Sequence, residues 1–200
     1  MRKIVLSLIA VILMTGWTLT SVWSQDAAPD YIGADKCKLC HSKPKLGGAE
    51  YLKWQKDPHS NAYKSLLTDK AKEMAKMANV TDPANDEKCL KCHITTLKFT
   101  TEETKAEGVG CEKCHGPGSL YKTNAIMKDH EASVKAGMRR LKGATPEETL
   151  KNAEALCKEC HGLEHKDENP AAKEFNFAEQ WPKIKHDEET LKAQFPEAYQ

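Results

Sequence analysis

The sequence is short of the apolar residues from which globular cores are built. Leu, Ile, Val and Phe together account for 24 of the residues from Gln25 to Gln200, about 14% of that stretch. A fraction below about 20% is typical of disordered chains when the net charge is also high. The formal net charge of the whole chain is only +1. The composition therefore predicts a folded chain whose interior is filled by something other than its own side chains.

Two further patterns are missing. The chain lacks the alternation of apolar and polar residues that is typical of strands, and it has no long run of lysine or arginine. The first absence predicts a mainly α fold of helices and loops. The second argues against a nucleic-acid partner or a membrane-binding patch, because scattered lysines are typical of a solvated surface.

The chain also lacks any cysteine outside a repeated motif. Two thiols separated by two residues can each add to a vinyl group of one haem, and a histidine directly after them is placed to ligate the iron. The string Cys-x-x-Cys-His occurs four times, at residues 37–41, 89–93, 111–115 and 157–161. It predicts four covalently attached haem c groups on Cys37, Cys40, Cys89, Cys92, Cys111, Cys114, Cys157 and Cys160, with His41, His93, His115 and His161 as proximal iron ligands.

Four porphyrins would supply the apolar surface that the side chains lack. We therefore expect helices and loops wrapped around four covalently bound haems in one domain, residues 25–200, and an apoprotein that does not fold stably. Two zinc sites of four thiolates each are the main alternative use of the cysteines. That alternative leaves unexplained a histidine at the same offset in all four motifs.

The first 24 residues have the layout of a secretory signal. Arg2 and Lys3 precede an apolar run, and small and polar residues follow as far as Ser24. We expect cleavage after Ser24 and a periplasmic protein, because c-type haems are attached after export. An uncleaved anchor is the alternative, since Ile4 to Trp23 is about long enough to cross a bilayer. Only that alternative attaches the protein to a membrane.

Local signals predict several helices. A short helix is expected at 49–56, and a second one after Pro58, over 60–80, with His59 held at the break between them. Further helices are expected where Thr81-Asp82-Pro83 leads into the second motif, at 124–136, and at 146–160 after the capping box that begins at Thr145.

Four histidines remain outside the motifs, so bis-histidine ligation of every haem would use all of them. They are His59, His130, His165 and His186. Ligation by two histidines sets a lower potential than ligation by histidine and methionine. The methionine candidates are Met74, Met77, Met127 and Met138.

Three blocks of sequence go beyond the motif spacing. They are Gly108 to Lys122 with Met127 to Asp129, Tyr31 to Cys37 with Trp54 and 59–62 downstream, and 175–177 with 183–186. Together they resemble the cytochrome c-554 family, tetrahaem electron carriers known from nitrifying bacteria. The resemblance implies closely packed haems, some of them stacked. It also implies that His130 completes the His41 haem, His59 the His115 haem and His186 the His161 haem.

The sequence departs from that family in two places. The loop between His41 and Trp54 looks longer, and His165 has no clear counterpart. The haem on His93 is five-coordinate in the nitrifier member. His165 therefore either fills that open position, in its own chain or a neighbouring one, or is exposed. We favour an exposed or intermolecular His165, because it follows His161 by only four residues.

These features favour a periplasmic electron carrier with redox partner proteins as donor and acceptor. The resemblance suggests hydroxylamine oxidoreductase as the donor. An enzyme is the first alternative, since an open position on the His93 haem could bind and reduce NO. A subunit of a haem filament, in which His165 ligates a neighbour's iron, is the second.

Overall fold

The computed structural model describes residues 28–98, 100–167, 169–170 and 172–200. The expected signal segment, residues 1–24, lies outside these ranges. The described residues form helices, turns and loops and contain no strand, which confirms the mainly α fold. None of the helices in these ranges has the length and apolar character needed to cross a membrane.

The helices are short, and the longest of those described has 12 residues. In chain order they are α1 (Ala34–His41), α2 (Glu50–Lys56), α3 (Ala62–Ser65), α4 (Asp69–Met77), α5 (Glu87–His93), α6 (Glu102–Ala106), α7 (Cys111–His115), α8 (Asn124–Met127), α9 (His130–Lys135), α10 (Pro146–Cys157), α11 (Phe177–Ile184) and α12 (Glu188–Gln194). Short 3-10 helices occur at η1 (Pro58–Asn61), η2 (Leu163–His165) and η3 (Pro196–Tyr199).

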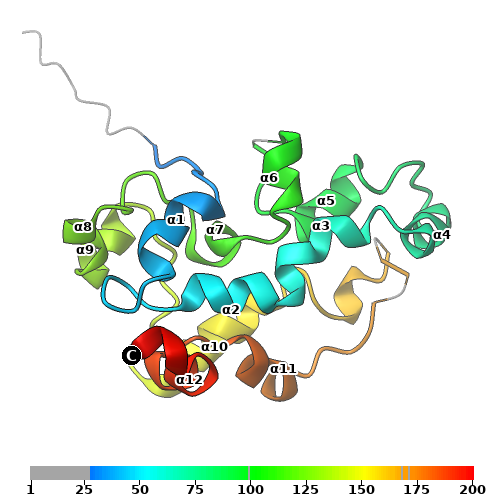
Figure 1. Cartoon of the computed structure of the whole chain (residues 1–200). Helices are drawn as coiled ribbons and strands as arrows, with labels where there is room; N and C mark the ends of the chain where they lie inside the picture. The colour runs from blue at the N-terminus through cyan, green and yellow to red at the C-terminus, as the bar shows by residue number, and fades with distance from the viewer. Residues whose placement is uncertain (1–27, 99, 168, 171) are drawn as a thin grey trace, which may run out of the picture.

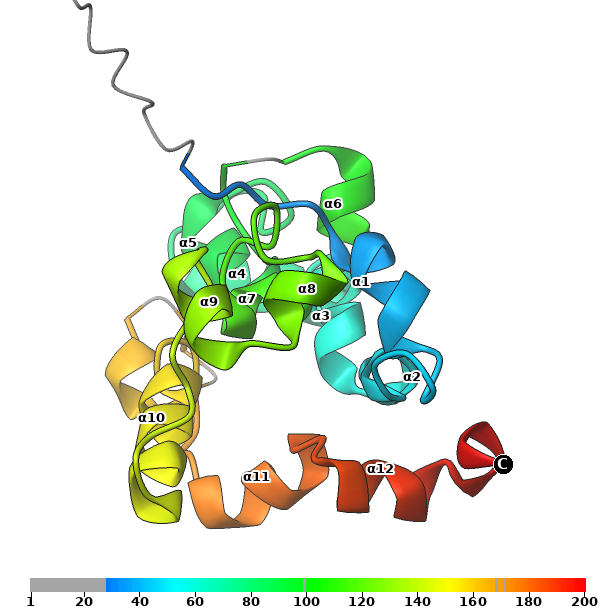
Figure 2. The same cartoon turned by 90° about the vertical axis from the view of Figure 1, so that its left-hand side faces the viewer.

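The C-terminal helices form one edge of the molecule. In both views α10, α11 and α12 run below the region that holds α1, α5 and α7 (Figures 1 and 2). The end of this edge is fastened to α2, because Leu191 and Phe195 pack against Ala49 in one buried cluster. The last 15 residues therefore close back on the first third of the described chain.

The buried apolar side chains form small separate clusters. The largest contains Tyr63, Leu66, Ala84, Leu90 and Ile94 and lies between α3 and α5. A second joins α2 to α12, and a third surrounds the end of α4. Clusters of this size bury little apolar area for a chain of this length, which agrees with the scarcity of apolar residues in the sequence.

Side-chain caps break two helices that the sequence predicts as continuous. The predicted helix over 60–80 is interrupted, because the Thr68 hydroxyl accepts the Ala71 N–H and starts α4 as a new helix. The predicted helix over 124–136 is likewise divided at Asp129, whose carboxylate accepts the Ala132 N–H at the start of α9. Both predictions of continuity were wrong, because a local cap outweighed the apolar spacing.

Two other predicted boundaries have different outcomes. Thr145 caps α10 as expected, although the helix ends at Cys157 and not at Cys160. The prediction that a helix begins at Thr81-Asp82-Pro83 was wrong. That segment is a turn, and α5 begins only after Asp86, which accepts the Lys88 N–H.

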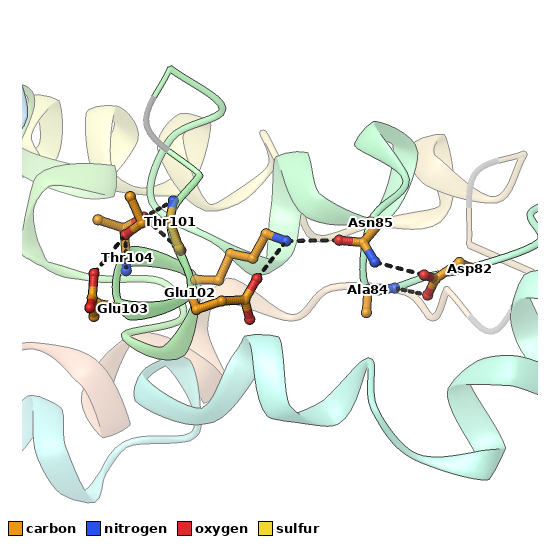
Figure 3. A network of polar contacts seen from close by, with 8 residues as sticks. Asp82, Ala84, Asn85, Thr101, Glu102, Glu103 and Thr104 are labelled. Carbon is orange, nitrogen blue, oxygen red and sulfur yellow. Dashed lines mark hydrogen bonds and ion pairs between the residues drawn. The ribbon is translucent and has the colours of Figure 1, made fainter.

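A polar network explains why the residues before α5 form a turn (Figure 3). Asp82 accepts the Ala84 N–H at 3.0 Å and the Asn85 side-chain amide at 2.7 Å. The buried Lys105 of α6 donates to Asn85 at 2.8 Å and to Glu102 at 3.3 Å. These contacts hold residues 82–85 in a turn, and the turn ties α6 to the approach of the second motif.

Candidate haem-attachment site

The four Cys-x-x-Cys-His motifs, numbered here as haem sites 1 to 4 in chain order, lie at helix ends. α1, α5 and α7 each end on the motif histidine, and the fourth motif begins on the last residue of α10. Residues three apart lie on one side of a helix, so both thiols of each of the first three motifs face the same way. All eight cysteines are free thiols of intermediate burial.

Two of the four motif histidines contact protein acceptors through Nδ1. In His41 this atom lies 3.1 Å from Glu50 Oε2, a hydrogen bond that raises the pKa of His41. In His93 it lies 2.8 Å from the Ala62 carbonyl oxygen. An imidazole that donates from Nδ1 carries its lone pair on Nε2, the atom that ligates a metal. The two rings are therefore oriented as iron ligands require.

Two histidines outside the motifs follow the same pattern. His59 Nδ1 lies 2.6 Å from Asp57 Oδ1, and His186 Nδ1 lies 3.1 Å from the Ile184 carbonyl oxygen. Sequence reasoning missed Asp57, although an acidic residue two positions before a candidate ligand is a usable signal for such an orienting contact.

The other two histidines outside the motifs, His165 and His130, make different contacts. His165 uses Nε2, which lies 2.8 Å from the Lys158 carbonyl oxygen. His130 opens α9 with its Nδ1 3.4 Å from Glu131 Oε1, at the upper end of hydrogen-bond distances, and its side chain is about one third exposed. Among the four candidates for distal ligands, His165 is thus the one whose Nε2, the atom that usually ligates a metal, already contacts a protein oxygen.

Thiol contacts pair site 1 with site 3 and site 2 with site 4. A hydrogen bond from the Cys111 thiol lowers the pKa of Cys37 and raises that of Cys111. In the same way, a hydrogen bond from Cys160 lowers the pKa of Cys92 to about 6. These contacts join motifs that are 68 or more residues apart in the chain.

The imidazoles of the motifs show the same pairing. Burial lowers the pKa of His115 to about 4, and the neighbouring His186 and His41 add to the effect. Burial also lowers the pKa of His161, whose neighbours His59, His165 and His93 act in the same direction. One group of imidazoles therefore gathers at sites 1 and 3, and another at sites 2 and 4.

Two ring contacts bring distal candidates to motif histidines. The rings of His59 and His161 lie 5.8 Å apart at 88°, and those of His115 and His186 lie 5.8 Å apart at 67°. The family resemblance implies the opposite combination, His59 with His115 and His186 with His161. Phe175 stacks on His161 with ring centroids 5.1 Å apart, so the tail also reaches site 4.

A buried carboxylate inside the third motif holds the beginning of the described chain. Glu112, 3% exposed, accepts the N–H groups of Ile32 at 3.0 Å, Gly33 at 2.8 Å and Gly118 at 2.6 Å. Because Gly33 immediately precedes α1, this side chain fixes site 1 against site 3. Sequence reasoning missed Glu112, since nothing in its position between Cys111 and Lys113 signals a long-range contact.

The third motif is also tied to the His59 segment. The Val109 N–H donates to the His59 carbonyl oxygen at 2.9 Å, and Trp54 Nε1 donates to the Val109 carbonyl oxygen at 2.9 Å. Gly108 has φ +66°, and a Cβ there would lie 2.6 Å from the His59 oxygen. This glycine thus allows a close backbone approach, and the approach positions His59.

The donor set fits covalent haem better than zinc. Within the described ranges, no three His, Cys, Asp or Glu side chains are arranged to hold one metal ion, as a four-thiolate zinc site would require. Thiol pairs on one helix side and imidazoles with Nε2 directed away from their Nδ1 acceptors suit thioether attachment and axial iron ligation.

Comparison with known proteins agrees with this chemistry. The family described as "Cytochrome c554 and c-prime" matches residues 36–116, the stretch that holds the first three motifs. The protein named "Cytochrome c-554" of Nitrosomonas europaea is 31% identical over 160 residues, which cover 72% of this chain and 63% of that protein. The chain therefore spans less than two thirds of the length of this relative. No solved structure matches the chain.

Proposed function

Because the chain belongs to the cytochrome c-554 family, whose members carry covalently bound haem c, we propose that it is a periplasmic tetrahaem electron carrier. In this proposal residues 1–24 direct export, residues 25–200 form one domain, and redox proteins act as donor and acceptor. The family resemblance makes an oxidoreductase acting on hydroxylamine the first donor to test.

The pairing of the motifs carries the proposal. α1 of site 1 packs against α7 of site 3, and Glu112 of site 3 accepts the Gly33 N–H just before site 1. Sites 2 and 4 are also neighbours, since Cys160 lowers the pKa of Cys92. Neighbouring attachment points leave little protein between the cofactors, and electron tunnelling is fast only across short gaps. Two close pairs on one small chain suit a relay that accepts electrons at one exposed edge and releases them at another.

The proposed iron ligands follow from the imidazole geometry. His41, His93, His115 and His161 serve as proximal ligands. We assign His186 to the His115 iron and His59 to the His161 iron, because those rings are neighbours. We assign His130 to the His41 iron, as the resemblance implies. When bound, the haems supply the one-electron chemistry of iron, and Glu50 and Asp57 orient the His41 and His59 rings.

One observation favours the NO-reducing alternative at site 2. His165 engages Nε2 at the Lys158 carbonyl, so no distal histidine is assigned to the His93 iron. An open axial position is what a small ligand such as NO requires. The same contact weakens the filament alternative, because His165 would have to release Lys158 before it could ligate a neighbour's iron through Nε2.

Haem quantification combined with EPR of the oxidised protein tests the proposal. The expected result is four haems for each chain, three of them low-spin and the His93 haem high-spin, all reducible by a small reductant. A high-spin signal that changes on addition of NO, with turnover of NO, would favour the enzyme. A chain with fewer than four haems would contradict the tetrahaem carrier.

A further inference from the structure

The first haem site is surrounded by an unusual exposed surface. Leu39, between the two cysteines of the motif, is 67% exposed, and Leu46 in the following loop is 54% exposed. The loop that joins α1 to α2 lies on the left-hand side of the molecule in Figure 1, below α8 and α9. Two large apolar side chains in so short a segment are notable in a chain with few of them.

Four lysines accompany these leucines, and no acidic residue occurs from Lys36 to Ala49. The lysines are Lys36, Lys38, Lys43 and Lys45, all exposed. Within the described residues none of them forms an ion pair, and Lys38 lies over the Tyr51 ring with its Nζ 5.5 Å from the centroid. By contrast, Lys72 and Lys192 each pair with an acid one helical turn away.

The loop is built against the haem site. The Lys43 N–H donates to the Cys40 carbonyl oxygen at 3.0 Å, and the Gly47 N–H donates to the Lys43 carbonyl oxygen at 3.1 Å. A Cβ on Gly47 would lie 3.3 Å from the Cys40 backbone and 3.4 Å from His41 Nδ1. The loop that carries Lys43, Lys45 and Leu46 therefore rests directly on the motif.

The covalent connection from this surface to the cofactor is short. Leu39 is bonded to Cys40, and Cys40 is bonded to the porphyrin once haem is attached. A protein that covers Leu39 thus contacts the chain one residue from the thioether. Lysines around an apolar contact steer a partner of opposite charge and fix its orientation, while the apolar centre excludes water.

We propose that Leu39 and Leu46, ringed by Lys36, Lys38, Lys43 and Lys45, form the docking surface for an electron-transfer protein with an acidic contact face. This inference rests on the proposed function, since it names the kind of partner that exchanges electrons at site 1. The four positive charges are concentrated in one segment of a chain whose formal net charge is only +1. Haem propionates make the loaded protein more negative overall, so attraction to an acidic partner depends on local positive surfaces such as this one.

The test uses the haem-loaded protein and flavodoxin, an acidic one-electron donor, as the probe. Lys43→Glu/Lys45→Glu reverses two charges of the surface. Lys70→Glu/Lys72→Glu reverses two charges on α4, which lies at the opposite end of the molecule in Figure 1, and changes the net charge equally. We expect the first variant to bind oxidised flavodoxin about tenfold more weakly at low salt, with a shallower salt dependence, and the second to change affinity less than about twofold.

A third variant separates the apolar contribution. Leu46→Ser should weaken flavodoxin binding while leaving the salt dependence as in the unaltered protein, because no charge is changed. Equal weakening by both double variants, or no weakening by Lys43→Glu/Lys45→Glu, would overturn the docking surface. Haem content and reduction by dithionite are measured in every variant. Loss of either would count against the electron carrier itself, so the two failures are distinguishable.

Discussion

The imidazole rings of His59 and His161 lie 5.8 Å apart and almost perpendicular to each other. His59 stands in η1, where Asp57 holds its Nδ1, and His161 ends the fourth motif 102 residues later. The contact joins two distant parts of the chain at haem site 4. The proposed assignment of His59 to that site differs from the one that the family resemblance implies, and this difference can be tested.

Removing one haem at a time shows which iron His59 ligates. Cys157→Ser/Cys160→Ser deletes the haem of site 4, and Cys111→Ser/Cys114→Ser deletes that of site 3. We expect His59→Ala to leave the low-spin EPR signals unchanged in the protein without site 4, because its iron is already absent. In the protein without site 3, the same substitution should convert one low-spin haem to high-spin. The reverse pattern would restore the assignment to His115.

Glu112 should be important for stability, because its buried carboxylate accepts three backbone N–H groups. Glu112→Ala leaves these donors without an acceptor and should lower the free energy of unfolding of the loaded protein by about 3 kcal/mol. Glu159 serves as the control, since it also lies between the two cysteines of its motif, one position later than Glu112 does, and is 48% exposed beside Arg139. Glu159→Ala should cost less than about 1 kcal/mol. Equal losses in denaturant titrations would contradict this account.

Glu107 should make stability depend on pH. Burial raises the pKa of this carboxyl above its ordinary value of 4.5, and the nearby charges of Asp35 and Glu112 add to the increase. The folded protein therefore binds the proton more tightly than the unfolded chain, so stability falls as pH rises from 4.5 through the raised pKa. Glu107→Gln should be more stable than the unaltered protein at pH 7, with the difference disappearing below pH 4.5. Melting temperatures across this range would show it, and a constant difference would exclude it.

The haem-free chain should not fold. The described apolar clusters are small and separate, so the porphyrins are needed to join them. Protein made without its first 24 residues stays in the cytoplasm, where haem is not attached, and should show little helical signal in far-UV circular dichroism. Native-like circular dichroism with a cooperative melt would refute the expectation that haem forms the core.

The cofactor chemistry could be predicted from the sequence, because the spacing of Cys111, Cys114 and His115 is a local requirement of the attachment. Helix breaks were less predictable. Thr68 and Asp129 occur within stretches of helical periodicity, and whether their side chains cap a new helix depends on the turn that precedes them. Contacts between motifs were not predictable, since nothing in the sequence indicates that Cys37 meets Cys111.

The docking surface could likewise be predicted only in part. Its lysines and leucines are visible in the sequence, but only the structure shows that Gly47 packs against the Cys40 backbone. The residues that support the ligands and motifs also differ in how far they could be predicted. Asp57 is close to His59 in sequence and could have been predicted, whereas Glu112 acts on residues about 80 positions earlier.

The central claim is that one exported chain carries four covalent haems, and intact-mass spectrometry of the purified protein tests it most directly. The expected mass is that of residues 25–200 plus four haems, with the addition resistant to denaturation because thioether bonds hold it. A mass equal to that of the bare chain, which a zinc protein would also give once denaturation releases the metal, would contradict the account. A mass that corresponds to fewer than four haems would contradict it as well.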